Sequence, residues 1–223
     1  MASLSARLRS LPERHGRVTL IILAAILALG FGLRAYRVVE PLATPGDDSR
    51  AYYALSKALY EEGSYGGPSF RDSSDWSPGA PLLYSAAYYG TAGAREGTAR
   101  IVELLCGLGS ILLVYLLGRR VGAAVDGEPG GRAAGLLAAF GAAVYPPFIH
   151  STGALFSEPP AMLTLPAAVL AFLWASEQTW QRVWLLPGLL FGLTALIRPE
   201  YLLVGVAFAL VAFVRAGRQH DWK

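Results

Sequence analysis

The chain has 223 residues, of which 54% are hydrophobic and only 16% are charged, and its net charge is +3. Soluble domains carry about 25% charged residues, and here long uncharged runs separate the charged clusters. This composition excludes an ordinary soluble domain and indicates a polytopic membrane protein. The basic residues lie mostly at the ends of apolar runs, where they indicate topology, so the positive charge requires no nucleic-acid partner.

A metal site built from histidine and cysteine is not expected. The chain has one cysteine, Cys106, inside an apolar run, and its three histidines are far apart in the sequence. Cys106 therefore has no internal disulfide partner, and no zinc-type ligand pattern is present. We predict no metal ligands and no cofactor.

The first apolar segment is predicted to span the membrane over residues 18–39. A cleaved signal peptide is the alternative, but the apolar core is longer than a signal core and no A-x-A-like cleavage site follows it. At 1.5 Å per residue the segment covers about 30 Å, enough for the hydrocarbon core. Arg34 and Arg37 come near its end and are expected to snorkel to the interface.

The polar region from 40 to 98 is predicted to carry two short helices. Residues 47–62 have apolar side chains at helical spacing, and Gly63 is expected to end this helix. Residues 81–89 form a shorter, aromatic segment. Neither is long enough to span a bilayer, and both are rich in tyrosine, so we expect them to lie in the interface.

Further spans are predicted between residues 99 and 214. Their ranges are 99–117, 133–149, 159–175, 183–197 and 201–214. A loop over 126–132, rich in glycine and acids, is expected to separate the second span from the third. The fold class predicted is thus an all-α polytopic membrane protein, a single membrane domain over 1–223 with about six transmembrane helices and a long first outer loop.

The distribution of lysine and arginine predicts the orientation. The short loops and tails that share a membrane side with the N-terminus carry more lysine and arginine than those on the other side. This predicts that the N-terminus lies in the cytoplasm. The 40–98 region, the 150–158 loop and the 198–200 turn then face outward. Two glycine pairs at four-residue spacing, Gly131/Gly135 and Gly188/Gly192, are expected to allow close helix packing.

Charge at the outward-facing points suggests a site. Asp47 and Asp48 follow the first span, Glu158 begins the fourth, and Arg198 and Glu200 lie between the last two. Charge near the hydrocarbon boundary is costly and marks a functional site by default. If the spans form a bundle, these side chains converge. Carboxylates beside a guanidinium suit proton abstraction from a hydroxyl, with the cation holding a phosphate.

Each of these residues also has a structural explanation. Asp47 or Asp48 would cap a helix. An acid such as Glu158 is favoured at a helix start by the dipole, and Arg198 would snorkel at the interface.

Other polar and aromatic residues have similar alternatives. Glu103 follows Arg100 by three positions, and the two are expected to pair on one helical face. An interfacial aromatic belt is predicted, from which a few rings could stack on a sugar instead. It consists of Trp76, Tyr52, Tyr53, Tyr84, Tyr88 and Tyr89.

The motifs follow one another in a recognisable order. The first span leads to Gly46-Asp47-Asp48-Ser49-Arg50-Ala51-Tyr52-Tyr53. Trp76-Ser77-Pro78-Gly79-Ala80-Pro81 then precedes the second short helix. Tyr145-Pro146-Pro147, Ser157-Glu158 and the segment from Gly188 to Arg198-Pro199 come later. This order resembles the GT-C membrane glycosyltransferases, in the branch of protein O-mannosyltransferases and bacterial aminoarabinose transferases.

The resemblance implies a glycosyltransferase that moves a sugar from a polyprenyl-phosphate donor to an acceptor hydroxyl, with inversion. The family's catalytic base matches Asp47, with Asp48 beside it. Its second acid matches Glu158, and its phosphate-binding cation matches Arg198 or Arg100. Tyr52 and Trp76 are further substrate-binding candidates.

The resemblance also implies partners and a location. They are a lipid-linked sugar donor, membrane lipids and an acceptor glycan, lipid or protein, at the outer face of the inner (plasma) membrane. In this branch a metal is not generally needed. Members usually have more than six spans and often an outer soluble domain. We therefore expect this chain to be the N-terminal half of such a fold, within a longer enzyme or beside a further membrane subunit.

Two other functions fit the sequence. One is a non-catalytic membrane module that binds polyprenyl lipids or assembles with a catalytic partner. The other is a small transporter, with Glu103, Glu158 and Arg198 along its path. Transporters often contain internal repeats, and no convincing repeat relates the two halves of this sequence.

Overall fold

The structure, a computed structural model, describes residues 4–40, 47–66, 75–91 and 93–219. The side chains of 4–15, 47, 181 and 216–219 lie outside this description. The described chain is helical and contains no β-strand. Its elements are α1 (Leu4–Val39), α2 (Asp47–Glu62), α3 (Gly79–Thr91), α4 (Glu96–Val144), α5 (Pro146–His150), α6 (Glu158–Ala175), η2 (Gln181–Trp184), α7 (Leu185–Ile197), η3 (Pro199–Tyr201) and α8 (Leu202–Gln219).

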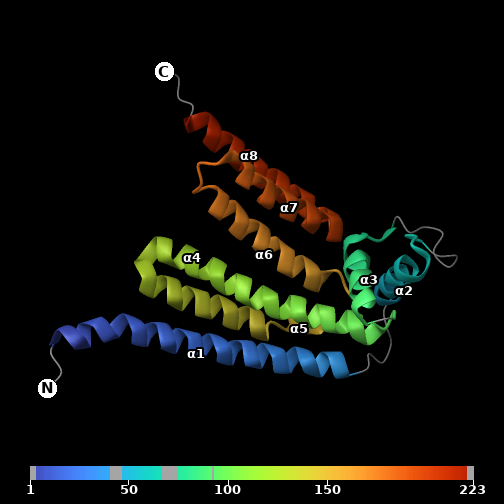
Figure 1. Ribbon diagram of the computed structural model, residues 1–223, viewed down its shortest axis with the longest axis horizontal. Coiled ribbons are helices and arrows are strands. Elements are labelled where there is room, and N and C mark those ends of the chain that lie inside the picture. Colours follow the sequence, from blue (N-terminus) through green and yellow to red (C-terminus); the bar gives the residue numbers. More distant parts are fainter. Residues whose placement is uncertain (1–3, 41–46, 67–74, 92, 220–223) are drawn as a thin grey trace.

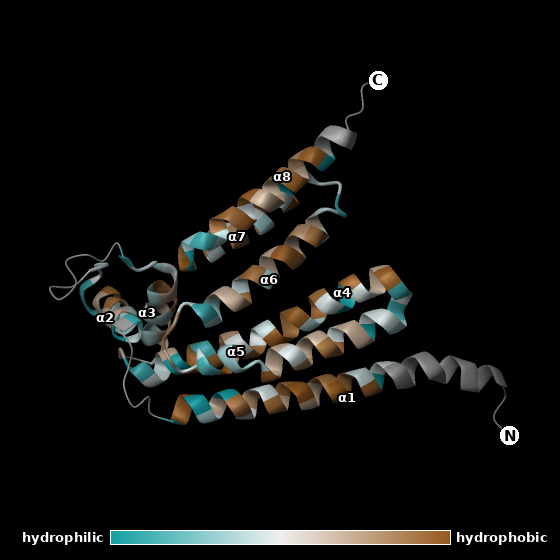
Figure 2. Cartoon of the chain, turned by 180° about the vertical axis from the view of Figure 1, so that it is seen from behind, coloured by the Kyte–Doolittle hydropathy of each residue, from teal (hydrophilic) through white to brown (hydrophobic). Residues whose placement is uncertain are grey.

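The long helices lie side by side, and α2 and α3 lie together at one end (Figure 1). The packing order is α1 against α4, α4 against α6, α6 against α7, and α7 against α8. At one end of this bundle α2 packs against α3, which also contacts α4 and α7. We call this the α2–α3 end. Hydrophobic residues line the middle of the long helices, and hydrophilic ones gather at their ends (Figure 2).

Among the described residues, three helices are long and apolar enough to cross a membrane. They contain the segments Gly16–Val39, Glu96–Val144 and Glu158–Ala175, and Arg182–Ile197 is a shorter apolar segment. The prediction of an all-α membrane protein is therefore confirmed. The number of passes and the orientation stay predictions.

The connection between the second and third predicted spans is much shorter than the loop expected over 126–132. The two spans form one element, α4, whose only non-helical dihedral angles are at Asp126 and Gly127. Gly127 has φ 62° and ψ −163°, a conformation open to glycine alone. Pro129 then lies in the first turn of the returning limb, where its missing N–H does no harm. α4 is therefore a hairpin of two helical limbs (Figure 1).

Glycines bring the two limbs of α4 together, as predicted for Gly131 and Gly135. A Cβ atom at Gly131 would lie 2.7 Å from the Arg119 carbonyl oxygen, and one at Gly135 would lie 2.9 Å from that of Tyr115. The same prediction was wrong for Gly188 and Gly192, where a Cβ atom would meet nothing within 4 Å.

Arg34 does not snorkel as expected, because its side chain is fully buried between α1 and α4. Its guanidinium donates hydrogen bonds to the carbonyl oxygens of Ala142, at 2.9 Å, and Ala143, at 3.0 Å. In a continuous helix these oxygens would accept from residues 146 and 147, but both are proline and have no N–H. The charged side chain of α1 thus satisfies two carbonyls that Pro146 and Pro147 leave without a donor.

The two short helices lie where they were predicted. α2 covers residues 47–62, and Gly63 follows it with φ 66°, a conformation typical of a helix end. α3 is slightly longer than the predicted 81–89 segment. Tyr84 and Tyr88 of α3 are fully buried, so these rings belong to the core at the α2–α3 end and not to an exposed belt.

Candidate functional site

Four parts of the chain carry candidate residues to the α2–α3 end. The first two turns of α2 supply Asp48 and Tyr52, and Trp76 precedes α3. Glu158 is the first residue of α6, and Arg198 follows the last residue of α7. Because α6 begins and α7 ends at this end of the bundle, residues far apart in sequence meet there.

An ion pair joins α6 to the end of α7. Arg198 Nη1 lies 2.6 Å from Glu158 Oε1, and Arg198 Nε lies 2.5 Å from Glu200 Oε1. Burial acts to lower the pKa of Arg198, but its hydrogen bonds to Glu200 and Glu158 outweigh this, and the pKa is raised. The guanidinium therefore stays charged, and part of it, 28% of the side chain, is exposed to an incoming anion.

A second contact joins α2 to the segment before α3. The indole Nε1 of Trp76 donates a hydrogen bond to Asp48 Oδ1 at 3.2 Å. Trp76 is itself held by Tyr65, whose hydroxyl donates to the Trp76 carbonyl oxygen at 2.6 Å. The Asp48 carboxylate thus has a fixed neighbour while its residue remains exposed.

Tyr52 connects the two contacts. Burial raises the pKa of its hydroxyl, while a hydrogen bond with Ser157 acts to lower it. The charges of Asp48 and Glu158 raise this pKa further, and that of Arg198 lowers it. All three charged groups are therefore near enough to influence one tyrosine hydroxyl. We define the candidate site as Asp48, Tyr52, Trp76, Glu158 and Arg198.

Arg100 is not joined to this site by any contact among the described residues. Its guanidinium pairs with Glu96 at 3.0 Å and donates to the Val38 carbonyl oxygen at 3.5 Å, beside the end of α1. The predicted pairing of Arg100 with Glu103 was therefore wrong. The spacing of the two residues allows it, but Arg100 pairs with Glu96 one turn earlier, and Glu103 is occupied by other donors.

Asp47 is the first residue of α2. Its side chain lies outside the described part of the structure, so its assignment stays a prediction. Sequence reasoning missed Ser49, which donates to the Ala154 carbonyl oxygen, and the Ser157 hydroxyl beside Tyr52. Both lie within quoted motifs, but a serine has no sequence signal that distinguishes such a contact.

The arrangement places carboxylates, a guanidinium and aromatic rings around one exposed region. A carboxylate can take a proton from a hydroxyl, and a guanidinium can hold a phosphate in a bidentate manner. In the described residues, no group of three or more His, Cys, Asp or Glu side chains could hold a metal ion. That the reaction needs no metal remains a prediction.

Comparison with known proteins gives one family. The model of the dolichyl-phosphate-mannose-protein mannosyltransferase family matches residues 77–223, which is more than half of the chain. Searches of curated proteins and of solved structures gave no significant match. The matched region contains Glu158 and Arg198, whereas Asp48, Tyr52 and Trp76 precede it.

Proposed function

Because the chain belongs to the dolichyl-phosphate-mannose-protein mannosyltransferase family, we propose that it transfers a sugar from a polyprenyl-phosphate donor to an acceptor hydroxyl. The family makes the protein a membrane glycosyltransferase of the GT-C type and implies a lipid-linked sugar donor and an acceptor. The polyprenyl monophosphate, the outer membrane face and the residue roles below are our proposal.

The proposed reaction is a single displacement at the anomeric carbon. Asp47 removes the proton from the acceptor hydroxyl as its oxygen attacks the anomeric carbon. The bond to the lipid phosphate breaks on the opposite face, so the configuration inverts and polyprenyl phosphate leaves. A correctly placed general base contributes about 10²- to 10⁴-fold to such a step.

The departing phosphate is assigned to Arg198. Its guanidinium is charged and partly exposed, and it already binds two carboxylate groups, Glu158 and Glu200. A phosphate oxygen can replace one of these exposed partners at little cost, because ion pairs near the surface contribute only about 0–1 kcal/mol. Trp76 holds the carboxylate of Asp48, which follows Asp47 in the sequence, and Arg100 is a second cation at the same end of the bundle.

The surroundings of the reaction follow from the sequence-based topology. We place the N-terminus in the cytoplasm and the candidate site at the outer face of the inner membrane. A glycan, lipid or protein hydroxyl is the acceptor, and no metal takes part. The observation that carries the proposal is the Glu158–Arg198 ion pair at the α2–α3 end, in a chain that belongs to a family of lipid-dependent mannosyltransferases.

The test measures release of polyprenyl phosphate from polyprenyl-phosphate mannose by the protein in proteoliposomes, with peptide, glycan and lipid hydroxyls as acceptors. Asp47→Asn should reduce release by about 10²- to 10⁴-fold, and Asp48→Asn should reduce it less. Asp126→Asn, at the hairpin turn on the opposite end, is the matched control. If the Asp47→Asn protein turns over at the wild-type rate, Asp47 is not the catalytic base. Donor binding without any release by the wild type supports the non-catalytic module instead.

A further inference from the structure

A buried carboxylate lies outside the candidate site, inside the turn that leads to it. Glu103 is fully buried on the first limb of α4. Its Oε2 accepts hydrogen bonds from the backbone N–H groups of Gly153, at 2.7 Å, and Leu155, at 3.1 Å. Its Oε1 accepts from the N–H of Phe156, at 2.6 Å, and from the Tyr84 hydroxyl, at 2.9 Å.

The turn over 153–156 is shaped around this carboxylate. Gly153 has φ 83° and Leu155 has φ 55°, and the N–H groups of residues 153, 155 and 156 converge on one point, while the Ala154 N–H donates to the Ser151 carbonyl oxygen. Such an arrangement is an anion-binding concavity. A left-handed conformation costs a non-glycine residue about 1–3 kcal/mol and persists only where the surroundings impose it. The hydrogen bonds to Glu103 supply that constraint at Leu155.

No lysine or arginine pairs with Glu103 among the residues that the structure describes. The nearest basic residue along the helix, Arg100, pairs with Glu96 instead. Its hydrogen-bond donors are therefore all neutral, and they come from the 153–156 turn and from Tyr84. Four hydrogen bonds to this one side chain tie the turn to α4 and α3.

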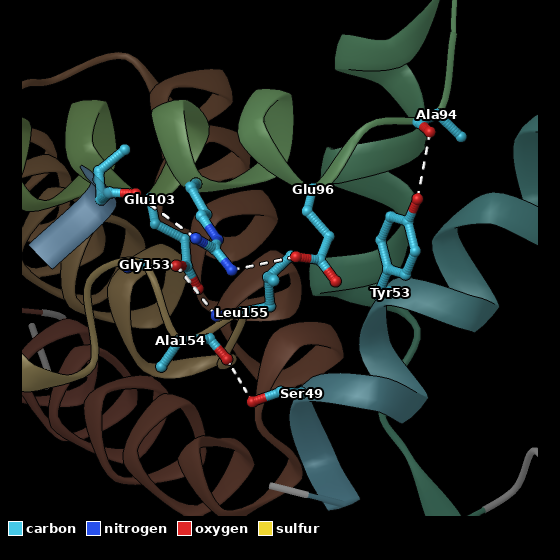
Figure 3. Close-up of polar contacts among 10 residues, drawn as sticks. Ser49, Tyr53, Ala94, Glu96, Glu103, Gly153, Ala154 and Leu155 are labelled. Carbon is cyan, nitrogen blue, oxygen red and sulfur yellow. Dashed lines mark hydrogen bonds and ion pairs between the residues drawn. The ribbon is translucent and has the colours of Figure 1, made fainter. Parts of the chain in front are cut away.

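The turn connects the carboxylate to both sides of the candidate site. The Ala154 carbonyl oxygen accepts from the hydroxyl of Ser49, the residue after Asp48 (Figure 3). At its other end the turn runs through Phe156 directly into Glu158. Tyr84 strengthens this connection, because its hydroxyl also lies 2.8 Å from the Phe156 carbonyl oxygen.

We propose that Glu103 is a positioning residue: by filling the 153–156 turn, its carboxylate sets the placement of Glu158 relative to Asp48. Glu103 touches no substrate, since it is fully buried and both oxygens are occupied. It acts through the start of α6 on one side and through Ser49 on the other. Its effect on catalysis rests on the function proposed above, whereas its effect on the turn does not.

The test variant is Glu103→Gln. An amide keeps the size of the side chain but places an NH₂ group against at least one backbone N–H, because Oε1 accepts from one backbone N–H and Oε2 from two. The backbone amides of residues 153, 155 and 156 should then exchange with deuterium about tenfold faster, which corresponds to about 1.4 kcal/mol per factor of ten. Glu128→Gln, the same change at the hairpin turn of α4, is the control and should leave this exchange unchanged.

Kinetics separate positioning from general destabilisation. Release of polyprenyl phosphate by Glu103→Gln should fall about 10- to 100-fold in kcat, the effect of a misplacement of about 1 Å, with the donor KM within about threefold. Glu103→Asp, which keeps the carboxyl group, should recover part of this loss. The proposal is overturned if exchange over 153–156 matches the wild type, or if exchange rises while kcat is unchanged.

Two further outcomes are decided by the same measurements. If the wild type releases no polyprenyl phosphate, the proposed function fails, and the exchange data alone support or overturn the positioning of the turn. If Glu103→Gln does not fold, Tyr84→Phe takes its place, since it removes one donor and leaves the backbone donors. Tyr84→Phe should accelerate exchange at Phe156, and unchanged exchange there overturns the proposal.

Discussion

Glu158 and Arg198 form an ion pair, with 2.6 Å between Oε1 and Nη1, at the point where α6 begins and α7 has just ended. Arg198 also binds Glu200, so one guanidinium holds two carboxylates in its fork. A lysine in its place would keep the charge but not this geometry. The pair therefore allows the charge of residue 198 to be tested separately from its shape.

We expect Arg198→Gln to lower kcat/KM for the polyprenyl-phosphate donor by about 10²- to 10³-fold, the effect of removing one group that stabilises developing negative charge. Arg198→Lys should lose about tenfold, or 1.4 kcal/mol. Steady-state release of polyprenyl phosphate measures both. Arg182→Gln, an exposed arginine before α7, is the matched control. Wild-type kinetics for Arg198→Gln would remove this residue from the phosphate site.

Trp76 is expected to act through its N–H group more than through its ring. The indole donates to Asp48 at 3.2 Å, and a hydrogen bond to a charged group contributes about 1.5–3 kcal/mol. Trp76→Phe removes the donor but retains an aromatic face, so kcat should fall by about tenfold. If the ring stacks on a sugar instead, Trp76→Phe should retain activity and Trp76→Ala should raise KM. Comparing the two variants in one assay distinguishes these roles.

Arg34 and the pair Pro146–Pro147 should be energetically coupled. Arg34→Met leaves the carbonyls of Ala142 and Ala143 without donors, at about 1–3 kcal/mol each. Replacing both prolines by alanine restores N–H groups that can bond the same carbonyls. The loss caused by Arg34→Met should therefore be smaller in that background, with a coupling on the order of 1–3 kcal/mol.

Denaturation in mixed detergent micelles gives the unfolding free energies for this cycle. Arg37→Met serves as the control substitution, because Arg37 lies on the same helix and pairs with Glu40. Its effect should be the same in both backgrounds. Equal effects of Arg34→Met in the two backgrounds would show that the prolines do not create the need for the arginine.

Stability should fall in alkaline solution as Tyr88 loses its proton. Burial raises the pKa of Tyr88 to about 12, a hydrogen bond with Ser56 acts to lower it, and the ordinary value is 10. Because the folded pKa lies above the unfolded one, the stabilisation is complete below pH 10 and disappears as the pH rises toward 12. Tyr88→Phe should flatten this part of the profile of unfolding free energy against pH. Tyr89→Phe, at the exposed neighbouring residue, is the control.

The positions of the helices followed from the sequence because long apolar runs dictate them. The hairpin in α4 did not, because the glycines, the acids and Pro129 in 126–132 have the composition of a loop. In the structure, Asp126 and Gly127 make the reversal, and Gly131 serves the approach of the two limbs. Composition reveals where a chain can turn but not how few residues it needs.

The candidate site was predictable in part for a similar reason. Asp48, Glu158 and Arg198 carry charge where apolar spans begin or end, and that anomaly is visible without a structure. Glu103 shows the limit, since helical spacing suggested Arg100 as its partner. It accepts hydrogen bonds from backbone N–H groups of a turn some fifty positions away. Almost every residue has a backbone N–H, so the sequence does not indicate which of them bind Glu103.

The buried position of Arg34 has a consequence for how the protein is made. Its Ala143 acceptor lies 109 positions further along the chain, and at 5–20 residues per second the ribosome reaches it on the order of 5–20 s later. During that interval α1 contains an arginine with neither acceptor, and a charged side chain in hydrocarbon is costly. We therefore expect α1 to reach its final place only after the returning limb of α4 has been inserted, so that the order of assembly would differ from the order of synthesis.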